Sequence, residues 1–341
     1  MRSGRKAERR NRRGAVRKSI ERIGFAAVAL TLAVTVAGCG SDSDSGASGS
    51  GDGGAVTIKH RLGETTVEGT PQRVVTIGNQ WLDAALALQV TPVGYVDMVA
   101  AGTNTKAPWE PESLGDAKQL SPSGNMVEQI AALNPDLILV PSYGVDKSSY
   151  DQLSKLAPTI GAVSEGVQVD LWTDDVTTLG KVLHKQEQAD KVIADVNGRI
   201  DELAKKYPGL RGKTYLTTML TGPAQLMVLA DPKDGSAKLF EQLGLRIPDR
   251  FVQEAGKAGG RLALSPERLA DLTSDLLVAS AMPGMEENFK GLPGYAQLPS
   301  VRSNGLAFVD AATINAINTP TALSVPFVLG KLEPALANVA K

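Results

Sequence analysis

Short runs of β-branched and aliphatic residues alternate with amphipathic stretches along most of the chain after Pro71. This alternation is typical of α/β sheets, in which helices connect mainly parallel strands. A small hairpin is expected within residues 55–67. The expected strands are 73–77, 92–96, 137–140, 160–163, 214–220, 226–229, 276–279 and 307–309. The expected helices are 81–89, 126–133, 150–156, 237–243, 266–272 and one that starts near Pro326.

One helical segment is much longer than the others. Within residues 186–206 the apolar positions recur at the i, i+3, i+4, i+7 spacing of one helix face: Ala189, Val192, Ile193, Val196, Ile200, Leu203 and Ala204. A helix of this length is a rod of roughly 31 Å, about the width of a small domain. We therefore expect two α/β lobes with Rossmann-like central sheets, joined by this helix: an N-terminal lobe over 55–173, a helical linker over 174–206 and a C-terminal lobe over 207–341.

The first 38 residues have the pattern of an export signal. Residues 1–22 carry ten Arg or Lys against two Glu, and residues 23–38 form an apolar run too short for a comfortable membrane span. The run ends in Val36-Ala37-Gly38-Cys39, which resembles a bacterial lipoprotein signal, in which the Cys is lipidated after cleavage. The alternative is a free or buried Cys at the end of a short membrane helix. Arg12-Arg13 leaves the export route, general secretory or twin-arginine, open.

Residues 40–54 contain only Gly, Ser, Asp and Ala. Such a segment has nothing to bury, so it is expected to be a flexible tether with an r.m.s. reach of about 20 Å. Residues 39–54 are therefore interpreted as a lipidated Cys39 with its tether. This interpretation predicts an extracytoplasmic protein anchored to the cell membrane.

The charge of the chain is distributed unevenly. The net charge is −1 overall, but without residues 1–22 there are 26 basic and 35 acidic residues. An acidic body argues against nucleic acid as a partner. A single Cys excludes an internal disulfide, and the two histidines, His60 and His184, exclude a His-rich metal cage. We expect no metal bound directly by side chains. We also expect a monomer with no resident cofactor.

Enzyme motifs are weak. Gly212-Lys213-Thr214 resembles the end of a phosphate-binding loop, but it precedes an expected strand instead of following one. A Ser-His-Asp hydrolase would need His60, in the expected hairpin, or His184, at the end of a helix. Neither histidine follows a core strand, so no catalytic activity is expected.

Several segments, in the same order along the chain, resemble ABC-importer solute-binding proteins of the ferric-siderophore and cobalamin class. They are 74–77 with 82–88, 92–95, 126–139, the Ala157-Pro158-Thr159 turn, 264–269 and 298–301. The resemblance implies two lobes joined by one backbone helix, with the ligand held in the cleft between them. It further implies that the protein binds a ferric siderophore, which itself holds the iron, and delivers it to the permease of an ABC importer. Another metal chelate, cobalamin or haem, is the first alternative; a surface-anchored α/β enzyme is the second.

Ligand-binding candidates lie mainly on the loops expected after the strands, because open α/β sheets bind ligands at the carboxyl ends of their strands. They are Asn79, Gln80, Trp81, Tyr143, Arg261, Met282 and Asn318. Tyr143 matches a ligand-contacting tyrosine of the hydroxamate binders in the resembling family. The places of that group's arginine and tryptophan are taken by Pro122 and Gly259. Few arginines lie near the expected loops, which favours a weakly charged ferric complex.

Two glutamates are candidates for permease docking. Glu128 and Glu267 each lie at the start of an expected helix, at corresponding places in the two lobes. The resemblance implies one glutamate per lobe inserted into arginine pockets of the permease subunits. The alternative is local, since acidic side chains at helix N-termini stabilise the helix dipole by about 0.3–1 kcal/mol.

Overall fold

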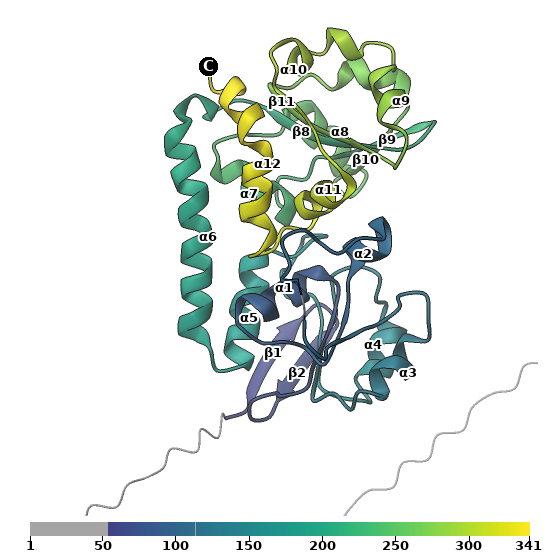
Figure 1. Cartoon of the computed structure of the whole chain (residues 1–341), viewed down its shortest axis with the longest axis vertical. Helices are drawn as coiled ribbons and strands as arrows, with labels where there is room; N and C mark the ends of the chain where they lie inside the picture. Colours follow the sequence, from purple (N-terminus) through teal and green to yellow (C-terminus); the bar gives the residue numbers. More distant parts are fainter. Residues whose placement is uncertain (1–53, 113) are drawn as a thin grey trace, which may run out of the picture. The chain divides into compact units, whose positions relative to one another are not determined.

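The computed structural model describes residues 54–112 and 114–341, which contain two five-stranded sheets and a separate hairpin (Figure 1). The hairpin pairs β1 (Val56–His60) with β2 (Gly63–Val67) in antiparallel fashion, as expected for residues 55–67. The expected signal peptide, Cys39 and residues 40–53 of the tether lie outside the described residues. None of the described helices is long and apolar enough to cross a membrane.

The sheet of the first lobe is entirely parallel, with strand order β5-β4-β3-β6-β7. Its strands are β3 (Val74–Ile77), β4 (Gly94–Val96), β5 (Lys118–Gln119), β6 (Leu137–Leu139) and β7 (Thr159–Ile160). The connecting helices are α1 (Asn79–Ala87), α2 (Met98–Thr103), α3 (Met126–Ala131) and α4 (Lys147–Leu153).

Both faces of this sheet are covered at its centre, which explains why β3 and β6 are almost entirely apolar. Side chains alternate between the faces, so Val74 and Leu139 pack into one core, while Val75 and Ile138 pack into the other. The first core also contains residues of the second lobe. The second core is confined to the first lobe, where Ile130, Tyr150 and Leu153 of α3 and α4 cover the sheet.

Two antiparallel helices link the lobes. The helix α5 (Trp172–Val182) packs against α1 and against α6 (Gln186–Lys206), which has the bounds predicted from its apolar spacing. Gly180 permits the close approach of α5 to α6, because a Cβ there would lie 2.6 Å from the Cβ of Ala189. Further along, α6 also contacts α7 and α12 of the second lobe. It therefore spans from one lobe to the other, as Figure 1 shows.

The second sheet has the order β10-β9-β8-β11-β12, which mirrors the order of the first. Only β9 runs antiparallel, because it forms a hairpin with β8. The strands are β8 (Tyr215–Gly222), β9 (Gln225–Leu229), β10 (Arg261–Leu264), β11 (Leu276–Ala281) and β12 (Leu306–Phe308). The α-helices are α7 (Gly235–Gln242), α8 (Asp249–Gly256), α9 (Glu286–Lys290), α10 (Pro299–Arg302), α11 (Ala311–Asn318) and α12 (Ser324–Val339). Three 3₁₀ helices complete the chain: η1 (Pro208–Leu210), η2 (Pro266–Asp271) and η3 (Tyr295–Gln297).

The predicted α/β class is confirmed, and each of the eight predicted strands is present. Most strand ends lie within two residues of the predicted position. The strand β8 extends two residues further than expected, through Thr221 and Gly222, into its hairpin with β9. The strand β10 was not predicted, because its four residues lie between glycines and a 3₁₀ turn. The short polar strand β5 and several short helices were also missed. The boundaries predicted for the domains stay predictions.

Candidate functional site

Two of the large apolar side chains that stay exposed lie just after first-lobe strands. Met98 follows β4 and is 39% exposed, and Tyr143 lies beyond the end of β6 and is 38% exposed. Exposed apolar side chains near the carboxyl ends of parallel strands mark the usual place of a ligand in open α/β sheets.

Both side chains line one pocket of about 310 Å³. The pocket lies where β3, β4 and β6 end, and α3 and α4 close it from the far side. Its twelve lining residues carry no charged side chain: Ile77, Val96, Met98, Pro122, Met126, Val127, Pro141, Tyr143, Gly144, Val145, Ser149 and Leu153. A concave, mostly apolar site with a few polar groups is typical for small-molecule ligands.

The Tyr143 phenol connects this pocket to the second lobe. Burial raises the pKa of the phenol above its ordinary value, and Asp175 adds to this rise. A hydrogen bond with the Thr319 side chain and the charge of Arg261 oppose it. The phenol is therefore protonated at neutral pH and can donate a hydrogen bond. Thr319 and Arg261 belong to the second lobe, so Tyr143 lies where the two lobes approach each other.

Arg261 is the first residue of β10. It pairs with Leu229 of β9, which in turn pairs with Thr217 near the start of β8, so Arg261 lies at the edge of the second sheet where β8 begins. Its Nη1 lies 3.6 Å from the Asp234 carboxylate and donates a hydrogen bond to the Gln168 side chain. The Asp234 carboxylate of the second lobe thus partly neutralises the guanidinium, and Gln168 of the first lobe adds an uncharged hydrogen bond.

The remaining second-lobe candidates differ in their positions. Asn318 ends α11 next to Thr319, and its Oδ1 is buried without a hydrogen-bond partner among the described residues. Met282 is 45% exposed, but it follows the carboxyl end of β11, opposite the edge that holds Arg261. Met282 lies four residues further along the strand direction than Arg261, and β11 is the third strand from β10 in the sheet. The two residues are therefore separated by roughly 20 Å. The structure therefore brings Tyr143, Arg261 and Asn318 together, but not Met282.

The prediction that Trp81 faces the ligand is wrong. The side chain is 1% exposed, packs in the main core and donates from Nε1 to the Val140 carbonyl at 2.9 Å. Asn79 and Gln80, in the same turn of α1, are each 4% exposed and hydrogen bonded inside the protein. The loop after β3 therefore turns these three side chains inward, because α1 begins immediately after Gly78.

Asn79 organises the loop that carries Met98. Its Oδ1 accepts from the backbone N–H groups of Met98 (2.8 Å) and Val99 (3.2 Å), and its Nδ2 donates to Asp97 and Glu110. Burial raises the pKa of Glu110 to about 7; Asp97 contributes to the rise, while the Asn79 hydrogen bond and Lys106 oppose it. Asn79, which was predicted to contact the ligand, instead holds the start of α2 in place.

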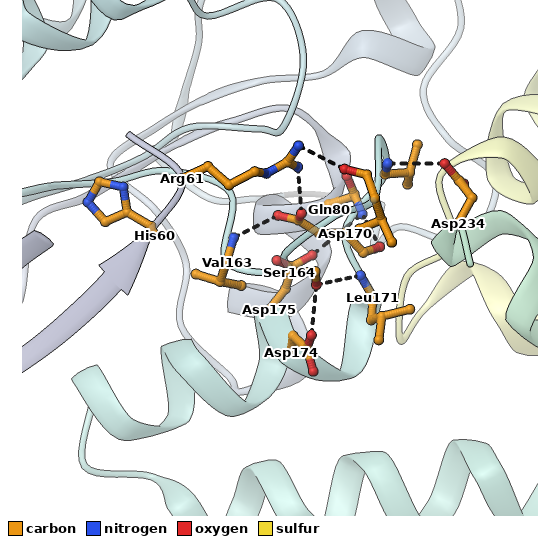
Figure 2. Close-up of polar contacts among 12 residues, drawn as sticks. His60, Arg61, Gln80, Val163, Ser164, Asp170, Leu171, Asp174, Asp175 and Asp234 are labelled. Atoms are coloured by element: carbon orange, nitrogen blue, oxygen red, sulfur yellow. Dashed lines mark hydrogen bonds and ion pairs between the residues drawn. The ribbon is translucent and has the colours of Figure 1, made fainter. Parts of the chain in front are cut away.

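A second polar network joins the lobes at the chain segment between β7 and α5 (Figure 2). Arg61 of the turn after β1 donates to Asp170 at 2.9 Å and to the Val167 carbonyl at 2.8 Å. Burial raises the pKa of Asp170, and the charge of Arg61 opposes that rise. In the same segment, the Val169 N–H donates to Asp234 of the second lobe at 3.2 Å. This segment is held by both lobes.

The docking candidates occupy equivalent positions in the topology. Glu128 lies in α3, between β5 and β6, and Glu267 lies in η2, between β10 and β11. Both are exposed, and their backbone N–H groups donate to the N-cap side chains of Asn125 and Ser265. Glu267 is on a 3₁₀ helix, where an α-helix was expected.

Several site residues were missed from the sequence. Thr319 and Gln168 contact the site from segments that gave no motif. Met98 was not among the ligand candidates, although an exposed Met after a buried strand is a usable signal. Pro122, singled out only as a departure from the family pattern, lines the pocket. Within the described residues, no group of three His, Cys, Asp or Glu side chains is arranged to hold a metal ion.

Comparisons with known proteins give a matching family and several relatives. The profile of the periplasmic binding protein family matches residues 74–313. The Fe(3+)-citrate-binding protein YfmC of Bacillus subtilis is 27% identical over 257 residues, which cover 74% of this chain and 77% of that protein. The probable siderophore-binding lipoprotein YfiY of Bacillus subtilis is 29% identical over 229 residues, which cover 65% of this chain and 67% of that protein.

Solved structures give the same result. The crystal structure of the iron uptake ABC transporter substrate-binding protein PiaA of Streptococcus pneumoniae superposes with a TM-score of 0.67 at 25% identity, covering 84% of this chain and 99% of that one. PiaA in complex with ferrichrome gives a TM-score of 0.68 at 25% identity, covering 83% and 98%.

Proposed function

Because the chain belongs to the periplasmic binding protein family, we propose that it binds a ferric siderophore and delivers it to an ABC-importer permease. The observation that carries the proposal is the apolar pocket that ends at Tyr143, whose phenol is hydrogen bonded to Thr319 of the second lobe and lies within the electrostatic influence of Arg261. The relatives named for Fe(3+)-citrate, siderophore and ferrichrome binding support a ferric chelate as the ligand. They do not agree on one chelate.

The two alternatives have less support. Cobalamin or haem would use the same fold, but YfmC, YfiY and PiaA are named for iron or siderophore binding. A surface-anchored enzyme would need a reactive group, and the solute-binding family is not a family of enzymes. His60 lies against Tyr150, 5.4 Å between ring centroids, and is hydrogen bonded to Thr65. We therefore propose that the protein has no catalytic activity of its own.

Replacing Tyr143 with Ala is expected to weaken binding of ferric siderophores. Loss of one central aromatic anchor costs about 1–3 kcal/mol, or roughly 5- to 150-fold in Kd. Titration monitored by tryptophan fluorescence measures the change, and circular dichroism and thermal melting check that the fold is intact. Tyr143→Phe, which keeps the ring and removes the hydroxyl, is expected to retain most of the affinity. Unchanged affinity of Tyr143→Ala for the best ferric siderophore would remove Tyr143 from the site.

We also propose that the protein is a lipoprotein, anchored outside the cytoplasm through Cys39. Its relative YfiY is named as a lipoprotein, which supports this location. Cys39→Ala is expected to leave the protein unprocessed or to release it from the membrane, because residues 40–54 have no apolar surface that could replace acyl chains. Fractionation and mass spectrometry of the N-terminus measure the result. Membrane retention of a processed Cys39→Ala protein at the wild-type level would exclude the anchor.

The permease is the proposed protein partner, with Glu128 and Glu267 as the docking residues, one on each lobe. Two separated charges fix the orientation of the bound protein and raise its rate of encounter with a complementary surface. Exposure of both side chains at equivalent topological positions supports this role. The solute-binding protein is proposed to act as a monomer.

A further inference from the structure

The pocket at the ends of β3, β4 and β6 has an unusual chemical uniformity for a site proposed to hold an iron complex. None of its twelve lining side chains is Lys, Arg, His, Asp or Glu. Hydrocarbon dominates the lining, and the Tyr143 and Ser149 hydroxyls are its polar side-chain groups. Such a lining favours apolar surface of a ligand and opposes a charged group, which would lose its hydration without gaining a partner.

The charges next to the pocket do not change this picture. Arg261 and Asp175 are the two titratable side chains that affect the pKa of the Tyr143 phenol. The Arg261 guanidinium already has the Asp234 carboxylate at 3.6 Å, and Asp175 is buried. An anionic ligand at Tyr143 would therefore face one cation that is already paired and one interior carboxylic acid group.

The segments that follow β4 and β6 at the pocket, residues 97–98 and 141–145, contain no Lys or Arg. We propose that the pocket of the first lobe holds the hydrocarbon part of the bound chelate, and that this chelate carries no net negative charge. The inference rests on the proposed function. A ferric ion coordinated by three singly ionised bidentate oxygen donors meets the condition, because their charges cancel. A tris-catecholate complex, in which each donor is doubly ionised, does not.

The charge is tested with three iron(III) chelates on the intact protein purified in detergent. Ferrichrome is neutral, ferrioxamine B carries one ammonium group, and a hexadentate tris-catecholate is anionic. We expect the better of the first two to bind at least about tenfold more tightly than the tris-catecholate at physiological salt. Tightest binding of the tris-catecholate overturns the inference and leaves the proposed function intact. Failure of all three to bind, together with ferric citrate, overturns the proposed function and the inference that rests on it.

Occupation of the pocket is tested with two adjacent serines of α4. Ser149 lines the pocket, whereas Ser148 is exposed and does not. Ser149→Phe fills part of the cavity and is expected to weaken binding of the preferred chelate at least about tenfold, and Ser148→Phe to change it by less than about twofold. Ser149→Leu, which fills less space, should lose less affinity, and it replaces Ser149→Phe if that variant does not fold. Wild-type affinity of a folded Ser149 variant that fills the pocket shows that no part of the chelate enters it.

Discussion

Removing both proposed docking carboxylates, Glu128→Ala with Glu267→Ala, is expected to abolish uptake of the ferric siderophore while its Kd changes by less than about twofold. Neither glutamate lines the apolar pocket, and both are exposed, with no ion pair to another described residue. Each should contribute one charged contact with the permease, so loss of both removes the means of orienting the two lobes together. Uptake of the iron-55 chelate by intact cells measures the effect, and titration of the purified protein measures the Kd.

A matched control removes the same charge from elsewhere. Glu64 of β2 and Glu202 of α6 are also exposed, and their double replacement by Ala leaves α3 and η2 unchanged. Normal uptake is expected for this control at equal protein abundance. If Glu128→Ala with Glu267→Ala also transports normally, the two carboxylates only stabilise the first turns of their helices, an effect of about 0.3–1 kcal/mol each.

The long helix α6 shows what periodicity can predict. This helix packs against α5, α7 and α12, and packing against neighbours requires apolar residues at helical spacing. That spacing can be recognised within the 21 residues of α6 itself, without knowledge of the neighbours. The central strands of the first sheet were predicted for a related reason: burial on both faces makes Leu137–Leu139 a short apolar run and Val74–Ile77 a run in which Thr76 is the one polar residue. By contrast, η2 has a normal helix start with Pro266 but only 3₁₀ geometry, a difference that depends on tertiary packing.

The site was predicted less well than the fold. Sequence position placed Asn79, Gln80 and Trp81 after β3, but the direction of each side chain depends on where α1 begins. Here the helix starts at once, and all three are buried. The separation of Met282 from Arg261 depends on the direction of β10, a strand that was not predicted. Tyr143 was placed correctly beyond the end of a core strand because its loop leaves the sheet before the next helix begins.

Replacing Asp234 with Ala is expected to destabilise the protein by about 2–4 kcal/mol, although the residue does not line the apolar pocket at Tyr143. Asp234 is the N-cap of α7: its Oδ1 accepts from the Ser236 N–H at 3.0 Å and from the Ser236 hydroxyl at 2.7 Å. Its Oδ2 accepts from the Val169 N–H of the segment before α5. Ala would remove the cap and leave a buried N–H of that segment without a partner.

Two features prevent rearrangement where the segment before α5 meets the start of α7. Gly235 packs directly against the Asp170 carbonyl, since a Cβ there would lie 2.3 Å from that oxygen. Its N–H also donates to the Val169 carbonyl at 3.2 Å, so the backbones of the two segments are already in contact. Water therefore has little room to replace the lost carboxylate, and the unsatisfied N–H should cost about 1–3 kcal/mol in addition to the cap.

Urea denaturation of the Asp234→Ala, Asp234→Asn and Asp231→Ala proteins measures the free energy of unfolding. Asn at position 234 keeps a good N-cap with one acceptor, so Asp234→Asn is expected to lose about half as much free energy of unfolding as Asp234→Ala. Asp231 is a neighbouring, partly exposed residue that accepts from the Lys233 N–H, and its replacement should cost less than about 1 kcal/mol. Hydrogen exchange separates the two roles of Asp234. If it only caps α7, Asp234→Ala accelerates exchange at Ser236 alone; if it also ties the lobes together, as the contacts indicate, the Val169 amide loses protection as well. A loss below about 1 kcal/mol with Val169 still protected would contradict this role for Asp234.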